Sequence, residues 1–183
     1  EDVAVLFCDV VDFTSYCDQH GPEDVVSHLQ GLVTAFETIA AKHGLEKIKT
    51  IGDAFMATAG LLQHVEDAAV ASVRAGLDMI EAARALESGW EIRVGVHMGP
   101  VVGGVIGRRM YSFDIWGDTV NIASRIVGQA EPGSVLVSAS IWRNLREAFE
   151  GRSKGLVELK GKGTLELIHC VRAVQPDVDA ATG

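Results

Sequence analysis

The order of strand-like and helix-like segments along the chain is the feature that most restricts its fold. Short apolar runs predict five strands in the first part of the chain, over residues 3–11, 45–51, 54–59, 90–97 and 101–106. Apolar residues at three- and four-residue spacing predict two helices, from Pro22 to the stop at Gly44 and from about Glu66 to Leu86. The first four strands and the two helices follow the order of the split βαβ, ferredoxin-like motif. We therefore expect an α+β fold with a palm-like core, in which helices pack around a mainly antiparallel sheet.

The second part of the chain adds a predicted αβαββ extension to this core. Its segments are a helix over about 118–127, a strand at 134–137, a short helix near 141–149 and two strands around 161–163. Two tight turns are also expected, a hairpin at Gly52-Asp53 and a turn at Met98-Gly99-Pro100.

Length, charge and cysteine content narrow the classes of function. The 183 residues suit one domain, over residues 1–174, followed by a frayed tail over 175–183. The chain has 16 Lys and Arg against 25 Asp and Glu, a net charge of −9, so its overall field does not attract nucleic acid or an anionic membrane. A phosphate-rich ligand would therefore have to be held by local groups. No run approaches the ~20 apolar residues of a membrane span, and Cys8, Cys17 and Cys170 form no CxxC pair, which favours a reducing, cytoplasmic location.

Two carboxylates mark places where predicted strands end or turn. Asp9 closes the first apolar strand, and Asp53 lies at the tip of the predicted hairpin. Each alone could be a helix cap or an ordinary turn residue. The split βαβ order places both at one end of adjacent strands, and two hard oxygen ligands there suit Mg²⁺ or Mn²⁺ holding phosphates. Asp12 is expected to cap a helix or to face solvent.

Asn121 and Arg125 lie four residues apart in the third predicted helix and therefore share one face. An amide beside a permanent cation can hold a sugar and a phosphate whose charge grows during a reaction. The alternative is a surface helix with a solvated arginine. Asp118 is expected to begin this helix as its cap.

Two pairs of lysines are weaker indications. Strand alternation places Lys47 and Lys49 on the same face of a sheet. Without further context, both side chains are expected to extend into solvent. Lys160 and Lys162 flank Gly161 in a predicted hairpin, from which they could point at phosphate or at water.

Four segments resemble, in order and spacing, the catalytic domain of class III nucleotidyl cyclases, the family of adenylyl and guanylyl cyclases. The resemblance covers about residues 3–172, and its most specific parts read FCDVVDFT, KIKTIGDAFM, GVHMGPVVGG and DIWGDTVNIASR. It implies that Asp9 and Asp53 ligate two Mg²⁺ or Mn²⁺ ions, with the backbone carbonyl of Val10 touching one of them. One ion would activate the ribose 3′-hydroxyl and the other would gather the triphosphate, whose phosphates lie along amides of the loop through Phe13 and Thr14.

The same resemblance assigns roles to the second half of the site. It implies that Asn121 orients the ribose, that Arg125 stabilises charge on the α-phosphate and that Lys160 contacts the triphosphate. Lys49 and Asp114 match the two positions that face the purine. Adenine offers a ring-nitrogen acceptor and an amino donor, which Lys and a carboxylate complement, so ATP is the favoured substrate.

Sites of this family lie between two domains, one giving the metal aspartates and the other giving the remaining groups. This single chain contains both sets, which implies a head-to-tail homodimer with two equivalent sites. The expected function is an adenylyl cyclase that converts ATP to 3′,5′-cyclic AMP and pyrophosphate, without nucleic acid or direct membrane contact.

Two alternatives stay open, a guanylyl cyclase and a catalytically silent, cyclase-like dimerisation module that regulates a neighbouring domain. One departure from the family is Pro100, where the metal-binding half of mammalian two-domain enzymes has Arg. Phosphate contacts there are expected to be fewer or to come from Arg108 or Arg109.

Overall fold

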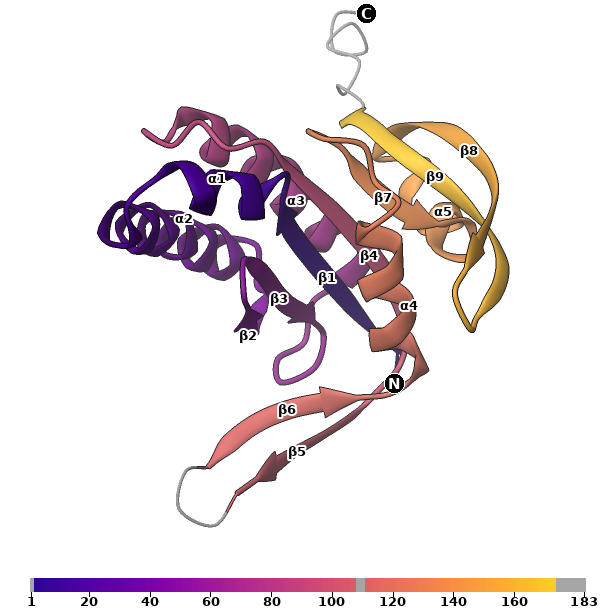
Figure 1. Ribbon diagram of the computed structural model, residues 1–183. Coiled ribbons are helices and arrows are strands. Elements are labelled where there is room, and N and C mark those ends of the chain that lie inside the picture. Colours follow the sequence, from indigo (N-terminus) through magenta and orange to yellow (C-terminus); the bar gives the residue numbers. More distant parts are fainter. Residues whose placement is uncertain (1, 108–110, 174–183) are drawn as a thin grey trace, which may run out of the picture.

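The computed structural model describes residues 2–107 and 111–173, and these form strands and helices in the predicted order (Figure 1). The strands are β1 (Asp2–Val10), β2 (Glu46–Ile51), β3 (Ala54–Ala59), β4 (Ile92–Pro100), β5 (Val102–Ile106), β6 (Ser112–Trp116), β7 (Val135–Ser138), β8 (Phe149–Leu159) and β9 (Gly163–Ala173). The helices are α1 (Phe13–Gln19), α2 (Pro22–Lys42), α3 (Ala68–Ala85), α4 (Asp118–Val127) and α5 (Ala139–Leu145). The tail expected over 175–183, like Arg108 and Arg109, lies outside the described residues.

Seven strands form one sheet in the order β2-β3-β1-β4-β7-β9-β8. Only the β4–β7 pair is parallel, and every other neighbouring pair that the structure describes in this sheet is antiparallel. The first half of the sheet, β2-β3-β1-β4, with α2 and α3, is the predicted split βαβ core, and α4 to β9 form the predicted extension. The α+β fold expected from the sequence is confirmed.

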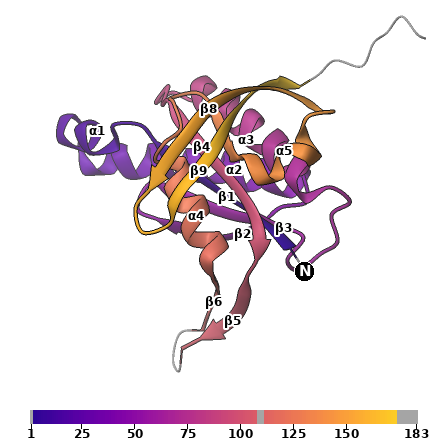
Figure 2. The same ribbon diagram turned by 90° about the vertical axis from the view of Figure 1, so that its right-hand side faces the viewer.

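Helices cover both faces of this sheet (Figure 2). On one face, α2, α3 and α5 pack over a large apolar core, while α4 lies on the opposite face above two smaller clusters. Strand β1 is buried on both sides, which explains its almost continuous apolar sequence. Leu6 and Cys8 face the large core, whereas Val5 and Phe7 face the α4 side. Asp9 has the parity of Val5 and Phe7 and therefore belongs to the α4 side.

Two glycines of β4 let α4 approach the sheet closely. A Cβ atom added at Gly95 would lie 2.4 Å from the backbone nitrogen of Val127, and one added at Gly99 would lie 2.7 Å from Oγ1 of Thr119. Both positions face α4 because they are four residues apart along a strand. These glycines therefore fix where α4, and with it Asn121 and Arg125, lies above the sheet.

The expected turn at Met98-Gly99-Pro100 is wrong. Strand β4 continues through these residues, because Gly99 serves the contact with α4 rather than a reversal of the chain. The next strand, β5, does not join the main sheet but pairs with β6, a strand not predicted from the sequence, in a separate two-stranded arm. Figure 1 shows this arm projecting away from the body of the molecule. No helix among the described residues is long and apolar enough to cross a bilayer.

Candidate active site

Asp9 and Asp53 lie at one end of two neighbouring strands. Antiparallel pairing of Cys8 with Phe55 places the end of β1 beside the β2–β3 turn, where Gly52 adopts a positive φ of 62° in a two-residue loop. A cavity of about 310 Å³ opens at this point. Its lining residues are Asp9, Val10, Asp12, Phe13, Thr14, Ser15, Asp53 and Arg93. All five residues expected to hold metal or line the phosphates thus share one cavity.

The electrostatics of this cavity favour a bound cation. Burial raises the pKa of Asp53, and the nearby Asp9 carboxylate raises it further, while hydrogen bonding to the backbone at Asp53 and Val10 acts in the opposite direction. Two carboxylates held so close repel each other until a positive charge lies between them. The donor set therefore fits a hard divalent ion that takes its remaining ligands from phosphates and water. Among the described residues no group of three or more His, Cys, Asp or Glu side chains could hold a metal by itself.

Arg93 is a member of this cavity that the sequence analysis missed. It lies directly opposite Asp9 in the β1–β4 pair, and its Nε and Nη2 donate to the same Asp9 oxygen, Oδ2, at 3.0 and 2.7 Å. Neither of these two bonds uses the other oxygen of Asp9, Oδ1. The antiparallel pairing of β1 with β4 was the only signal that could have found it, and the register of that pairing is not readable from one sequence.

Helix α1 closes one side of the cavity. Asp12 occupies its N-cap position with a positive φ of 55° but makes no capping hydrogen bond, and its side chain is exposed. Of its two expected roles, facing solvent is therefore the observed one. No residue of α1 is fully buried, and the helix is held by Phe13 and Tyr16, whose rings meet Trp90 edge to face at 5.8 and 4.9 Å.

Lys49 and Asp114 meet on the α4 side of the sheet. The Lys49 Nζ lies 2.5 Å from Oδ2 of Asp114, which joins β2 to β6. Burial alone would raise the pKa of Asp114, but hydrogen bonds from Lys49 and from the Ile115 backbone, together with the Lys49 charge, lower it. The carboxylate is therefore held ionised beside the ammonium group.

The expectation that Lys47 and Lys49 share a face is wrong. A bulge at Ile48 makes Lys47 pair with Ala57 and Lys49 with Met56, two consecutive residues that face opposite sides. Lys47 therefore turns toward α2 and binds Glu37 at 2.5 Å, while Lys49 faces α4 and β6.

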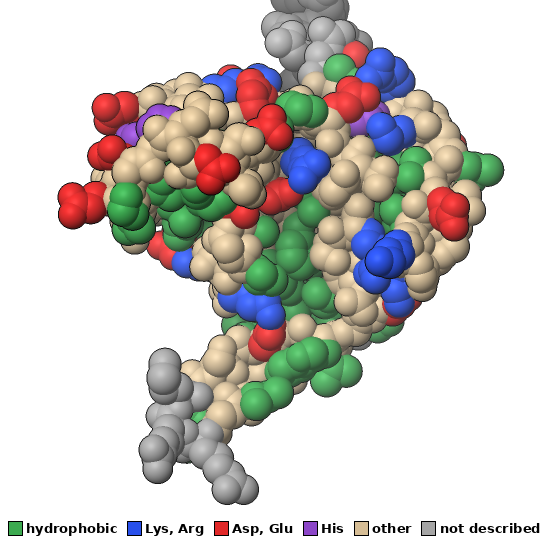
Figure 3. All heavy atoms as spheres, in the orientation of Figure 1, with side chains coloured by type: hydrophobic (Ala, Val, Ile, Leu, Met, Phe, Trp, Pro, Cys, Tyr) green, Lys and Arg blue, Asp and Glu red, His purple; other side chains and the backbone are tan. Residues whose placement is uncertain are grey.

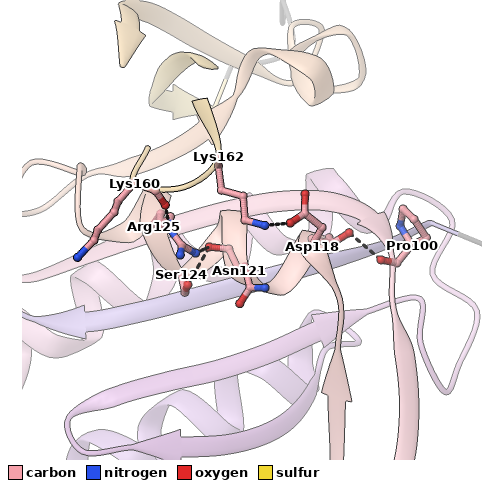
Figure 4. Close-up of polar contacts among 8 residues, drawn as sticks. Pro100, Asp118, Asn121, Ser124, Arg125, Lys160 and Lys162 are labelled. Atoms are coloured by element: carbon pink, nitrogen blue, oxygen red, sulfur yellow. Dashed lines mark hydrogen bonds and ion pairs between the residues drawn. The ribbon is translucent and has the colours of Figure 1, made fainter. Parts of the chain in front are cut away.

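Asn121, Arg125 and Lys160 lie together around α4 (Figure 4). The Nε of Arg125 donates to the backbone carbonyl of Lys160 at 2.6 Å, and its Nη1 donates to the carbonyl of Asn121 at 2.9 Å. The Lys160 Nζ has no hydrogen bond or ion pair within the part of the chain that the structure describes. These three residues form one group, as the spacing of Asn121 and Arg125 and the resemblance predicted.

The predicted cap at Asp118 is wrong. Asp118 is the first residue of α4, after Gly117 at the N-cap, and its carboxylate pairs with Lys162. An acidic side chain in a first turn still complements the helix dipole. Thr119 donates from Oγ1 to the carbonyl of Pro100 at 2.7 Å, so Pro100 helps to anchor α4.

The two sets of groups remain apart within one chain. Among the described residues, no hydrogen bond or ion pair joins Asp9 or Asp53 to the residues around α4 and β6. Figure 3 shows the face with α4 hollowed between two lobes, with apolar side chains in the hollow and basic groups on separate parts of its rim. Over the described ranges, one chain therefore presents two groups of candidate residues that no hydrogen bond or ion pair connects, called half-sites below.

Comparison with known proteins places these half-sites in a family. The adenylate and guanylate cyclase catalytic domain family matches residues 1–171. The chain belongs to this family. Cyclases of the family generally depend on divalent metal and act as dimers on a nucleotide, in agreement with the carboxylate pair and the separated half-sites.

Individual relatives include both adenylyl and guanylyl cyclases. An adenylate cyclase of Mycobacterium bovis is 35% identical over 100% of this cyclase domain, which spans only 42% of that relative. The crystal structure of the guanylate cyclase domain of RhGC from Catenaria anguillulae, in complex with GTP, matches with a TM-score of 0.91 at 31% identity, covering 95% of this chain and 98% of that chain. The adenylyl cyclase CyaB from P. aeruginosa matches with a TM-score of 0.89 at 25% identity, covering 95% of each. The family assignment thus identifies a nucleotide cyclase domain and leaves the choice of base to the chemistry of the site.

Proposed function

We propose that this domain is an adenylyl cyclase that converts ATP to 3′,5′-cyclic AMP and pyrophosphate. The observation that supports this choice is the contact between Lys49 and Asp114, on the face that also holds Asn121 and Arg125. An ammonium donor beside a carboxylate acceptor complements the ring nitrogen and the amino group of adenine. Guanine presents a carbonyl acceptor and a ring N–H donor instead, and would meet this pair with donors and acceptors mismatched.

The residues of the chain divide the reaction between them. Asp9, Asp53 and the Val10 carbonyl would hold two divalent ions, which when bound supply Lewis-acid activation and neutralise phosphate charge. The amides at Phe13 and Thr14, at the start of α1, would lie along the phosphates.

The groups around α4 act on the sugar and the reacting phosphate. The Asn121 amide would orient the ribose so that its 3′-oxygen attacks the α-phosphorus in line with the departing pyrophosphate. Arg125 stabilises the charge that grows on the α-phosphate, and Lys160 binds the triphosphate. Positioning and charge stabilisation are sufficient for such a transfer.

The separation of the half-sites supports a head-to-tail homodimer with two equivalent sites. Each chain would give Asp9 and Asp53 to one site and Lys49, Asn121 and Arg125 to the other. The β5–β6 arm supports such an assembly, because its large apolar side chains are exposed in the single chain, Val105 by 62% and Ile106 by 61%. The three free thiols, of which Cys8 and Cys170 are buried, support a cytoplasmic setting for the domain.

The direct test is turnover of ATP and of GTP by the purified domain with Mn²⁺ or Mg²⁺, at concentrations high enough for dimers. We expect cyclic AMP from ATP and much slower turnover of GTP. Preference for GTP would favour the guanylyl cyclase alternative. No turnover of either, in a preparation that is dimeric and folded, would favour the silent regulatory module, although Asp9, Asp53, Asn121 and Arg125 are all present.

Exchange of the purine-facing pair tests base choice separately. Lys49→Glu combined with Asp114→Cys replaces the donor and acceptor by the types typical of guanylyl cyclases. We expect the ratio of kcat/KM for ATP to that for GTP to fall by at least about tenfold, since a mismatched buried polar contact is worth about 1–3 kcal/mol. An unchanged ratio would contradict the assignment of these two residues.

A further inference from the structure

The turn between β8 and β9, residues 160–162, is tied to α4 at two points. On one side, the Lys160 carbonyl accepts a hydrogen bond from Nε of Arg125 at 2.6 Å. On the other side, the Lys162 ammonium group pairs with the carboxylate of Asp118, which lies at the N-terminal end of α4. Figure 4 shows both contacts, with the Lys160 side chain extending away from the Asp118–Lys162 pair. The backbone of Lys160 is thus fixed while its side chain stays free.

Apolar packing holds the rest of the same unit. Ile126 of α4 is fully buried in a cluster with Leu159 and Leu167, which lie on β8 and β9. This cluster fixes the strands beneath the turn but leaves the turn itself exposed, apart from Lys162, whose side chain is 22% exposed. The polar contacts with Arg125 and Asp118 therefore decide where the tip of the turn lies relative to α4.

Arg125 depends on the same contacts for its own orientation. Its Nε and Nη1 are occupied by the carbonyls of Lys160 and Asn121, so Nη2 is the guanidinium nitrogen without a partner among the described residues. A shift of the turn would move one of the two acceptors that hold the guanidinium plane. Reaction rates are sensitive to such shifts, and a displacement of about 1 Å can cost about a hundredfold.

We propose that Asp118 and Lys162 are positioning residues, whose ion pair holds the β8–β9 turn against α4 and so sets Lys160 and Arg125 for the triphosphate. This inference rests on the proposed function, because it assigns Lys160 and Arg125 to the nucleotide. Asp118 touches neither group directly and acts through Lys162. The pair is partly exposed, with 64% of the Asp118 side chain accessible, so its effect on overall stability is small.

A heterodimer with a single working site tests this proposal. One chain carries Arg125→Ala and supplies only Asp9 and Asp53, while the other carries Asp9→Ala and supplies only the groups around α4. With Asp118→Asn in the Asp9→Ala chain we expect kcat/KM for ATP to fall about two- to fivefold, the range for an ion pair of this exposure. The same change in the Arg125→Ala chain should leave turnover unchanged. The proposal would be overturned if kcat/KM fell equally whichever chain carried Asp118→Asn, or if it fell in neither case.

Further variants separate positioning from direct contact. If the two residues act as a pair, Asp118→Asn and Lys162→Met together should cost no more than either alone. Asp118→Glu, which keeps the charge, should recover most of the activity. If Lys162→Met lowered kcat/KM more than Asp118→Asn did, and the two losses were additive, Lys162 would be a direct ligand of the nucleotide. That result would overturn the proposal that the two residues act as a pair.

A matched control and a measurement without turnover complete the test. Asp78→Asn removes a charge from α3 whose Oδ2 contacts both Lys42 and His43 at 2.8 Å. This change lies outside the β8–β9 turn and α4 and should leave turnover unchanged in either chain of the heterodimer. In the homodimer, Asp118→Asn should speed amide hydrogen exchange at Lys162, whose N–H donates to the Leu159 carbonyl at 2.8 Å. Unchanged exchange there would refute the proposal even if the domain made no cyclic AMP. Faster exchange without cyclic AMP would contradict only the proposed function.

Discussion

The surroundings of Asp53 oppose the ionised state of its carboxyl group. Burial and the Asp9 carboxylate both raise its pKa, so its charge destabilises the metal-free protein. We expect Asp53→Asn to raise the melting temperature in the presence of a chelator and to abolish metal-dependent turnover. Such a trade of stability for activity is common at functional sites. A lower melting temperature for the variant, measured by calorimetry, would mean that Asp53 has a structural role instead.

Asp114 shows the opposite shift, and its stabilising effect depends on pH. Its pKa in the folded protein lies below the ordinary value of 3.8, because the contacts with Lys49 and the Ile115 backbone outweigh burial. A lowered carboxyl pKa contributes stability that is complete above the ordinary value and is lost as the pH falls through the folded value. The difference in unfolding free energy between wild type and Asp114→Asn should therefore narrow as urea titrations move from about pH 6 to about pH 3. A constant difference would contradict the Lys49–Asp114 pairing.

For single residues, the sequence could predict that Asp9 and Asp53 lie close together but not which side chains contact them. Asp9 and Asp53 could be brought together from the order of elements alone, because that order decides which strand ends are neighbours. Arg93 could not be found, since its contact with Asp9 depends on the β1–β4 register. The bulge at Ile48 reversed the face of Lys47 relative to Lys49, and a one-residue irregularity leaves no mark in an alternating pattern.

Helix α4 is the element on which one half-site depends, and two glycines of β4 determine its position. Gly95→Ala would place a Cβ atom 2.4 Å from the Val127 nitrogen, so α4 would have to move. We expect a loss of about 1–3 kcal/mol in unfolding free energy, together with a fall in turnover as Asn121 and Arg125 shift. Gly31→Ala is the matched control, because a Cβ there meets nothing within 4 Å in the middle of α2. It should stabilise the protein by about 0.5–1 kcal/mol. Equal effects from the two substitutions, measured by chemical denaturation, would refute the close contact.

The same glycines explain why the elements were only partly predictable. Gly99 followed by Pro100 is a typical turn sequence, yet the structure uses Gly99 for helix packing, and β4 runs on. The core elements β1, α2, β2, β3, α3 and β4 were predictable because their apolar periodicity reflects burial inside one chain. Strand β5 was also predicted, but β6 and its pairing with β5 outside the main sheet were not. Of β6, Ile115 is buried against the body of the chain, whereas the apolar residues of β5 are exposed and follow no intrachain core.

At the scale of the whole molecule, the proposed division of each site between two chains would make the assembly part of the chemistry. The acidic chain holds Asp9 and Asp53 at one end of β1 and β3, and two basic residues proposed to bind the nucleotide, Lys49 and Arg125, lie on β2 and α4. On the proposed account the net charge of −9 does not oppose ATP, because bound divalent ions and the partner's cations would act locally where solvent screening is weak. A lone chain should therefore bind and turn over ATP poorly.

Mixing two inactive chains tests this account most directly. On the proposed roles, Asp9→Ala would lack a metal ligand and Arg125→Ala would lack the group that stabilises the transition state, so each homodimer should make no cyclic AMP. Random exchange of equal amounts gives heterodimers in half of the dimers, each with one intact site of two, so about a quarter of wild-type activity should return. Complete inactivity of the mixture, with heterodimers demonstrated by affinity-tag co-purification, would contradict the shared site.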